Sequence, residues 1–125
     1  MFTAWFALAC ALAGFPQTHE DRALACRSLT GSEAPLTVRG RLYAANGGGS
    51  GFRIWIVGTR RIVWLSPRID PAIPDAVRQA FKPFDEQVYG DFTLVPLAPD
   101  RPGVMREVCF VSGEHLVVRQ GKARS

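Results

Sequence analysis

Apolar and polar residues alternate along several short stretches of the chain, and a period of two is typical of β-strands. The clearest stretch is 36–44, whose alternate positions on one face are Leu36, Val38, Gly40 and Leu42. A second stretch at 52–57 alternates in the same way, and a third follows at 61–66. The pattern therefore predicts three consecutive strands in the first half of the chain.

Turn residues separate these predicted strands. The run 46–51 is Asn-Gly-Gly-Gly-Ser-Gly, and Gly58 opens a tight reversal before the third strand. A phosphate-binding loop would need a Lys-Ser/Thr pair and a helix after its glycines. The glycine run leads into a strand instead, so we interpret it as a hairpin linker.

A helical period replaces the alternation between Pro67 and Phe84. The apolar residues at helical spacing are Ile73, Val77, Ala80, Phe81 and Phe84. Pro74 suits the first position of a helix, so we predict a helix of about two turns over 74–82. Beyond it, the predicted strands are 89–96, 105–112 and 115–119, the last two joined by a turn at Gly113-Glu114.

This order of elements predicts a mainly β domain. Three strands, a helix and then two or three strands is the element order of the OB-fold, a small and partly open barrel. We therefore expect a small OB-like barrel of five to six short strands with one short helix between strands 3 and 4. A flat sheet with a helix packed on one side is the alternative.

An apolar segment without charged side chains precedes the strands, at 1–15. Its length fits a secretory signal, and Ala-x-Ala occurs at 11–13 and at 23–25. We predict a signal peptide over 1–25, with cleavage after Ala13 as the alternative, and a periplasmic or secreted location. An uncleaved anchor, a lipidated N-terminus and a buried N-terminal helix are the competing interpretations, and membrane contact is expected only through the first two.

Cysteine usage agrees with export. The chain has three cysteines, and removal of the signal takes away Cys10 and leaves Cys26 and Cys109. An even pair in an oxidising compartment suggests a disulfide, with two unpaired thiols as the alternative. The sequence has neither a Cys-x-x-Cys motif nor a Cys/His cluster. We therefore predict neither a metal site nor a cofactor.

Length and charge limit the remaining chain to one small basic domain. We place this domain at 26–119, followed by a basic tail at 120–125. The formal net charge of the whole chain is +4, and only Lys82 and Lys122 are lysines. A basic domain suits an anionic partner, although a merely solubilising charge is the alternative.

One face of the predicted sheet gathers arginine and aromatic side chains. The candidate ligand-binding residues are Arg39, Arg41, Tyr43, Arg53, Trp55 and Trp64. Arginines beside aromatic rings suit anionic groups and stacking on sugars or bases, and OB-folds bind such ligands on this side. Export favours an envelope glycan, another anionic ligand or a protein partner over nucleic acid. The alternative is an ordinary outer face on which arginine stems cover tryptophan rings.

Catalysis has little support in the sequence. His115 is the only histidine after residue 25 and lies beside a predicted turn, so we interpret it as solvated. Asp85, Glu86 and Asp91 are close together but suit turn capping. We predict no catalytic residue and expect a binding module of the cell envelope. The alternative is a structural or assembly protein that docks on an envelope protein complex.

Several whole segments resemble small uncharacterised exported proteins of proteobacteria. They are Arg39–Leu42, Asn46-Gly47, Arg53–Arg60, Val88–Leu97 and Pro102–Met105. The resemblance spans roughly 36–119 and implies an exported OB-like domain without an assigned activity. That group carries a cysteine near the place of Val95, facing the later cysteine. Valine at this position leaves Cys109 without that partner.

Overall fold

The computed structural model describes residues 18–30, 34–45 and 51–121 of the chain. Three predictions fall wholly or partly outside the described residues. They concern the apolar segment 1–15, the glycine-rich run at 46–50 and the end of the basic tail at 122–125.

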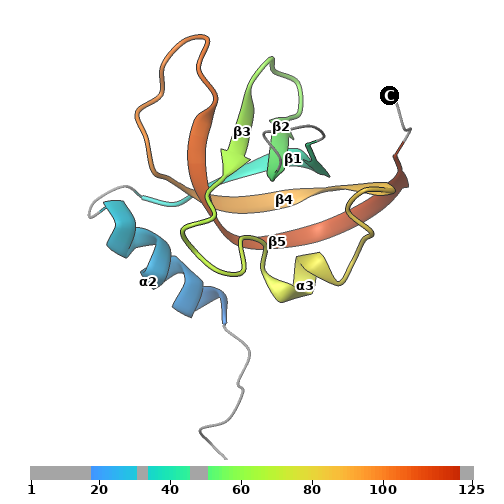
Figure 1. The fold of residues 1–125 in the computed structure, drawn as a ribbon, viewed down its shortest axis with the longest axis horizontal. Coiled ribbons are helices and arrows are strands. Elements are labelled where there is room, and N and C mark those ends of the chain that lie inside the picture. Colours follow the sequence, from blue (N-terminus) through green and yellow to red (C-terminus); the bar gives the residue numbers. More distant parts are fainter. Residues whose placement is uncertain (1–17, 31–33, 46–50, 122–125) are drawn as a thin grey trace, which may run out of the picture.

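The described residues form five strands and two helices (Figure 1). The strands are β1 (Leu36–Ala44), β2 (Phe52–Ile56), β3 (Ile62–Leu65), β4 (Glu86–Pro96) and β5 (Arg106–Gln120). Helix α2 (His19–Thr30) precedes β1, and helix α3 (Asp75–Arg78) lies between β3 and β4. The prediction of a mainly β domain with a helix between its third and fourth strands is therefore confirmed.

The five strands close into a ring. Four of the strand pairs are antiparallel: β1 with β2, β2 with β3, β1 with β4, and β4 with β5. The parallel pair β3–β5 completes the order β1-β2-β3-β5-β4. The alternative of a flat sheet with a helix packed on one side is therefore wrong.

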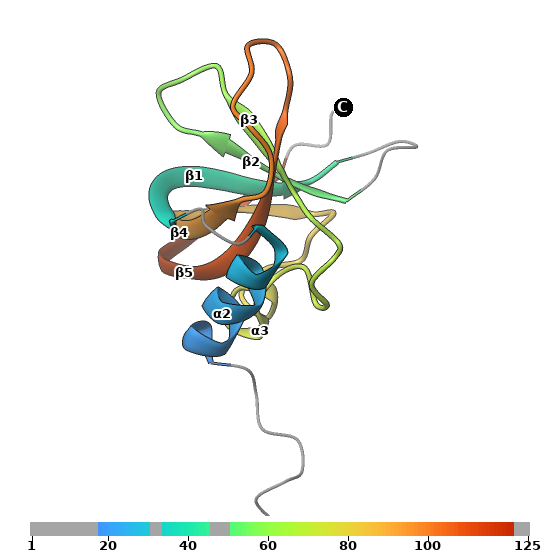
Figure 2. The same cartoon turned by 90° about the vertical axis from the view of Figure 1, so that its left-hand side faces the viewer.

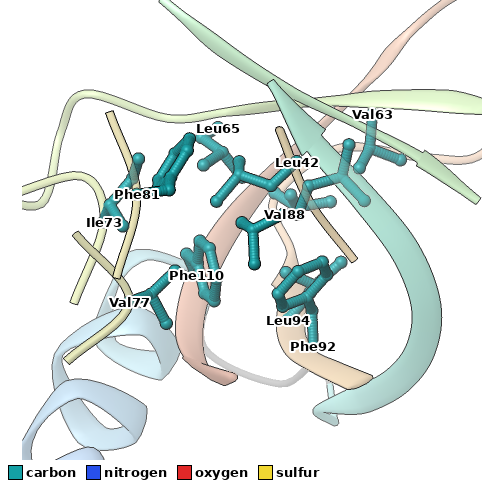
Figure 3. Close-up of a cluster of buried hydrophobic side chains, with 12 residues drawn as sticks. Leu42, Val63, Leu65, Ile73, Val77, Phe81, Val88, Phe92, Leu94 and Phe110 are labelled. Carbon is teal, nitrogen blue, oxygen red and sulfur yellow. The ribbon is translucent and has the colours of Figure 1, made fainter. Parts of the chain in front are cut away.

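Apolar side chains fill the inside of the ring (Figure 3). The predicted alternation in the first two strands is confirmed, because Leu42 and Ile54 are fully buried. The rings of Phe92 and Phe110 meet edge to face, with their centroids 5.4 Å apart. Glycine at position 40 leaves room for Ile54 in this core, since a Cβ atom at Gly40 would lie only 2.4 Å from Cγ2 of Ile54.

Helix α3 is shorter than predicted, and one of its expected core residues is exposed. Pro74 is the N-cap rather than the first helical residue, and the helix ends at Arg78. The helical period therefore does not extend to Phe84, which is 79% exposed. The other expected large apolar residues, Ile73, Val77 and Phe81, are buried in the core.

The predicted turn at Gly113-Glu114 is wrong, because β5 runs through it without a break. The pairing of β4 with β5 shifts register between Tyr89 and Asp91, and His115 has a φ of 55°. Such a bulge places an extra residue in one strand and bends it. The sequence pattern suggested two strands because the bulge interrupts the alternation.

Helix α2 was not predicted, and it packs beside β4 and β5 (Figures 1 and 2). Thr18 caps it, since Oγ1 accepts a hydrogen bond from the backbone N–H of Asp21 at 3.0 Å. Arg22 is only 2% exposed and reaches the sheet. The predicted domain start at residue 26 therefore falls inside a packed helix.

A disulfide joins α2 to β5. The bond links Cys26 to Cys109 across 83 residues of chain, as expected from the sequence. Val95 lies directly opposite Cys109 on β4, and with Val111 these residues form a second buried cluster beneath the helix. The partner of Cys109 thus comes from the helix rather than from the neighbouring strand.

Candidate ligand-binding face

Strand pairing brings the predicted arginine and aromatic residues together on the outside of β1, β2 and β3. Arg53 lies opposite both Tyr43 and Trp64, because β2 is the middle strand of the three. Arg41 lies opposite Trp55 in the adjacent row. We call Arg41, Tyr43, Arg53, Trp55 and Trp64 the arginine–aromatic face. Directly opposed side chains on one sheet face lie close enough to interact.

Arg41 is held between two aromatic rings. Its guanidinium carbon lies 5.1 Å from the ring centre of Tyr43 and 5.2 Å from that of Trp55. Both distances are within the range of cation–π attraction. The Nε atom is buried and has no hydrogen-bond partner among the described residues. The guanidinium is therefore fixed in place with an unsatisfied donor.

Trp55 is oriented by the turn that follows its strand. Its Nε1–H donates a hydrogen bond to the backbone oxygen of Thr59 at 2.7 Å. Thr59 Oγ1 in turn donates to the oxygen of Ile56 and accepts from the N–H of Arg61. The polar edge of the indole is thus occupied, and the ring face is what Trp55 offers to Arg41.

Arg39, the sixth predicted residue, lies two residues before Arg41 on the same side of β1 and has a carboxylate partner. Its Nη1 is 3.4 Å from Oδ1 of Asp91, the residue opposite it on β4. Asp91 also contacts Nδ1 of His115 at 2.9 Å through its other oxygen. The hydrogen bond from His115 is the main reason that the pKa of Asp91 is lowered, and Arg39 adds to the shift.

The pair of His115 and Asp91 is exposed to solvent. The His115 side chain is 73% exposed, and the pair lies on the open sheet surface. The bulge in β5 explains the contact, because it turns His115 toward β4.

One end of the arginine–aromatic face opens into a mostly apolar pocket of about 500 Å³. Arg53 and Trp64 line it together with Phe52 and Met105, among others. A volume of this size is typical of small-molecule sites, which combine apolar walls with a few polar groups. Pro67 and Ala72 also line this pocket, so it extends from the arginine–aromatic face to the segment that follows β3.

A second pocket of about 420 Å³ lies beside the face on β4 and β5. Its lining residues are Arg39, Gln87, Tyr89, Val117, Arg119 and Gln120. Of these residues, only Arg39 was predicted from the sequence. Alternation along β4 could have placed Gln87 and Tyr89 on the outer side together with Asp91. The position of Arg119 could not be predicted in this way, because the bulge shifts the register of β5.

The two loops at the far end of the ring are tied together. They connect β2 to β3 and β4 to β5, and both project away from the helices (Figures 1 and 2). Arg61 of one loop forms an ion pair with Asp100 of the other. Arg106 adds a hydrogen bond to the backbone oxygen of Ala98 at 2.8 Å. Arg61 therefore links the second loop to Thr59, because its backbone N–H donates to Thr59 Oγ1 at 2.9 Å.

Comparison with known proteins adds no relative: no protein-family model, no curated protein and no solved structure matches the chain. Among the described residues there is no group of three or more His, Cys, Asp or Glu side chains placed to hold a metal ion. No helix in the described part of the chain has the length and hydropathy needed to span a membrane.

Proposed function

We propose that the chain is an exported, OB-like binding module of the cell envelope that recognises an anionic or glycan ligand through the arginine–aromatic face. The OB-like assignment is supported by the ring order, by the parallel pairing of β3 with β5 and by α3 between β3 and β4. OB-folds bind oligosaccharides and oligonucleotides on the side formed by their second and third strands. Arg53, Trp55 and Trp64 lie on these two strands.

The unsatisfied guanidinium of Arg41 is the observation that carries this proposal. A buried donor without a partner costs about 1–3 kcal/mol, so such groups are rare and call for an explanation. Because Nε itself is covered, a carboxylate or phosphate would pair with the two terminal nitrogens, which have no acceptor among the described residues, in a charge-assisted contact. Tyr43 and Trp55 hold the guanidinium ready for that contact.

Neighbouring residues support an anionic ligand that also has a flat surface. Arg53 forms no ion pair with any other described residue. Trp64 lies directly opposite it and lines the same pocket. A cation beside a half-buried ring suits a sugar that carries an acidic group, because the ring contacts the apolar face of the sugar.

The disulfide supports the export part of the proposal, since disulfides persist in oxidising compartments.

The packing of helix α2 limits where a signal segment could be cleaved. Cleavage after Ala25 would separate Arg22 from Cys26, although both anchor the helix to the sheet. We therefore place the cleavage upstream of Thr18, in agreement with the Ala-x-Ala site at 11–13.

Calorimetric titration of the full chain with hexagalacturonate, a carboxylated glycan, tests the proposed function. We expect binding by the wild type, and a loss of at least about tenfold in affinity for Arg41→Gln, which removes a charged hydrogen-bond donor. Arg78→Gln makes the same charge change on the exposed surface of α3 and should bind normally. Neutral cellohexaose should bind more weakly than hexagalacturonate.

Two results would contradict the proposal: absence of binding by the wild type, or unchanged affinity in a folded Arg41→Gln variant.

Docking on an envelope protein complex is the second candidate. It is favoured by the adjacent exposed residues Val104 and Met105 in the loop between β4 and β5. That function predicts a stable protein partner that is lost on Val104→Asp and kept on Arg41→Gln.

A further inference from the structure

The polar pocket on β4 and β5 has the chemistry of a second anion site. Arg39 and Arg119 supply two guanidinium groups to its walls, and Gln87 and Gln120 supply two amides. No carboxylate belongs to the described residues that line it. Arginine pairs with carboxylates in a planar, bidentate way, while amides and the phenol of Tyr89 can hydrogen-bond to hydroxyl groups.

The charges around the pocket leave these cations available to a ligand. Arg119 forms no ion pair with another described residue. The contact of Arg39 with Asp91 spans 3.4 Å and is exposed to solvent, so it is weak and can be exchanged for another acceptor. Glu86, the nearest acidic residue along β4, accepts instead from the backbone N–H of Lys82 at 2.7 Å.

Rigid elements position this pocket. Gln87 lies opposite Arg119, and Glu86 lies opposite Gln120, at the paired ends of β4 and β5. The backbone N–H of Gly121 donates to the oxygen of Asp85 at 2.8 Å and closes this end. A site on paired strands keeps its geometry before the ligand arrives.

The pocket adjoins the arginine–aromatic face through Tyr89. This residue lies opposite Arg41 on one side and opposite Val117 on the other. Neighbouring strands are about 4.8 Å apart, so roughly 10 Å separates β1, which carries Arg41, from β5, which carries Arg119. A short chain with repeated acidic groups spans this separation, so its carboxylates can contact both guanidinium groups at once.

We propose that the polar pocket is a second subsite of the same binding face and that the ligand is an acidic oligosaccharide carrying more than one carboxylate. This inference rests on the proposed function at Arg41. One acidic group binds at Arg41, and another binds at Arg119 in the polar pocket. The amides and Tyr89 contact hydroxyl groups of the sugar between them. Linking two acidic groups raises affinity because the second contact becomes intramolecular.

NMR titration of the full chain with galacturonate and with hexagalacturonate tests the subsite. The Nε–H resonance of Arg41 reports binding at the first site, and that of Arg119 reports binding at the second. We expect the wild type to bind the hexamer at least about tenfold more tightly than the monomer. Arg119→Gln should remove most of that gain, while the monomer still shifts the Arg41 resonance as in the wild type.

The outcomes distinguish a failure of the second subsite from a failure of the proposed function at Arg41. If Arg41→Gln abolishes binding of both probes while Arg119→Gln leaves the gain intact, the second subsite is wrong and the proposed function stands. If Arg41→Gln changes neither titration, both are wrong. If a dodecamer of thymidylate binds more tightly than hexagalacturonate and shifts both resonances, the assignment to acidic sugars is overturned. Arg78→Gln is the matched control.

Discussion

At the scale of single residues, two arginines show how differently this protein uses the same side chain. The guanidinium of Arg22 donates to the backbone oxygen of Phe110 at 2.8 Å and to that of Pro71 at 2.9 Å. The guanidinium of Arg41 has no acceptor among the described residues, although its Nε is buried. We therefore assign a structural role to Arg22 and a binding role to Arg41.

Replacing Arg22 should destabilise the protein strongly. Burial lowers the pKa of Arg22 and nearby Asp75 opposes this shift, but the guanidinium stays charged at any ordinary pH. Arg22→Met would leave the oxygens of Pro71 and Phe110 without their donor. We expect a loss of about 2–4 kcal/mol in the free energy of unfolding. Urea unfolding measures it, and the exposed control Arg78→Met should change by less than about 0.5 kcal/mol.

The pKa of Asp91 should depend on His115. The hydrogen bond from His115 is the largest cause of the lowered pKa, so His115→Ala should raise it toward the ordinary value. A carboxyl group with a lowered folded-state pKa adds stability above its unfolded pKa, and this is lost as pH falls through the folded value. Carbon NMR titration of the carboxyl group measures the shift. A larger change in Arg39→Ala than in His115→Ala would contradict this order of causes.

At the scale of elements, α2 is an integral part of the fold. Arg22 and Cys26 are one turn apart on one face of the helix, and both are buried. The disulfide closes a loop of 83 residues, for which the chain-entropy model gives about 4–5 kcal/mol. A helix fixed by both contacts cannot be lost in processing without exposing the cluster around Val95 and Val111.

Intact mass of the protein from its native envelope fraction tests this account of α2. We expect a mature chain that begins upstream of Thr18, with a mass 2 Da below that of the reduced form because of the Cys26–Cys109 bond. A mature chain that begins at Cys26 would show that α2 is not needed in the folded protein. An added lipid on Cys26 would likewise contradict the disulfide.

At the scale of the whole molecule, alternation predicted the sheet well. It placed β1 at its exact bounds and put Leu42 and Ile54 in the core. The arginine–aromatic residues were assigned to a common face by the same rule, and the pairing of β1, β2 and β3 brings them together. Local periodicity is sufficient where one side of a strand is buried and the other is not.

Features that depend on distant contacts were missed. The twelve residues of α2 look polar, and the helix is stabilised by Arg22 bonding to carbonyls far along the chain. Its only local signal is Thr18 followed by Asp21, which resembles a capping box. The polar pocket depends on the bulge at His115, because that bulge sets which residues of β5 stand beside Gln87 and Tyr89.

The most direct test of the central claim follows the Nε–H resonance of Arg41 while hexagalacturonate is added to the full chain. An acidic ligand that pairs with this guanidinium should shift the resonance saturably and at the same concentrations as it binds in calorimetry. The Nε–H of Arg78 should not move. Saturable binding that leaves the Arg41 resonance unchanged, or equal small shifts of all arginines, would contradict the assignment of the arginine–aromatic face.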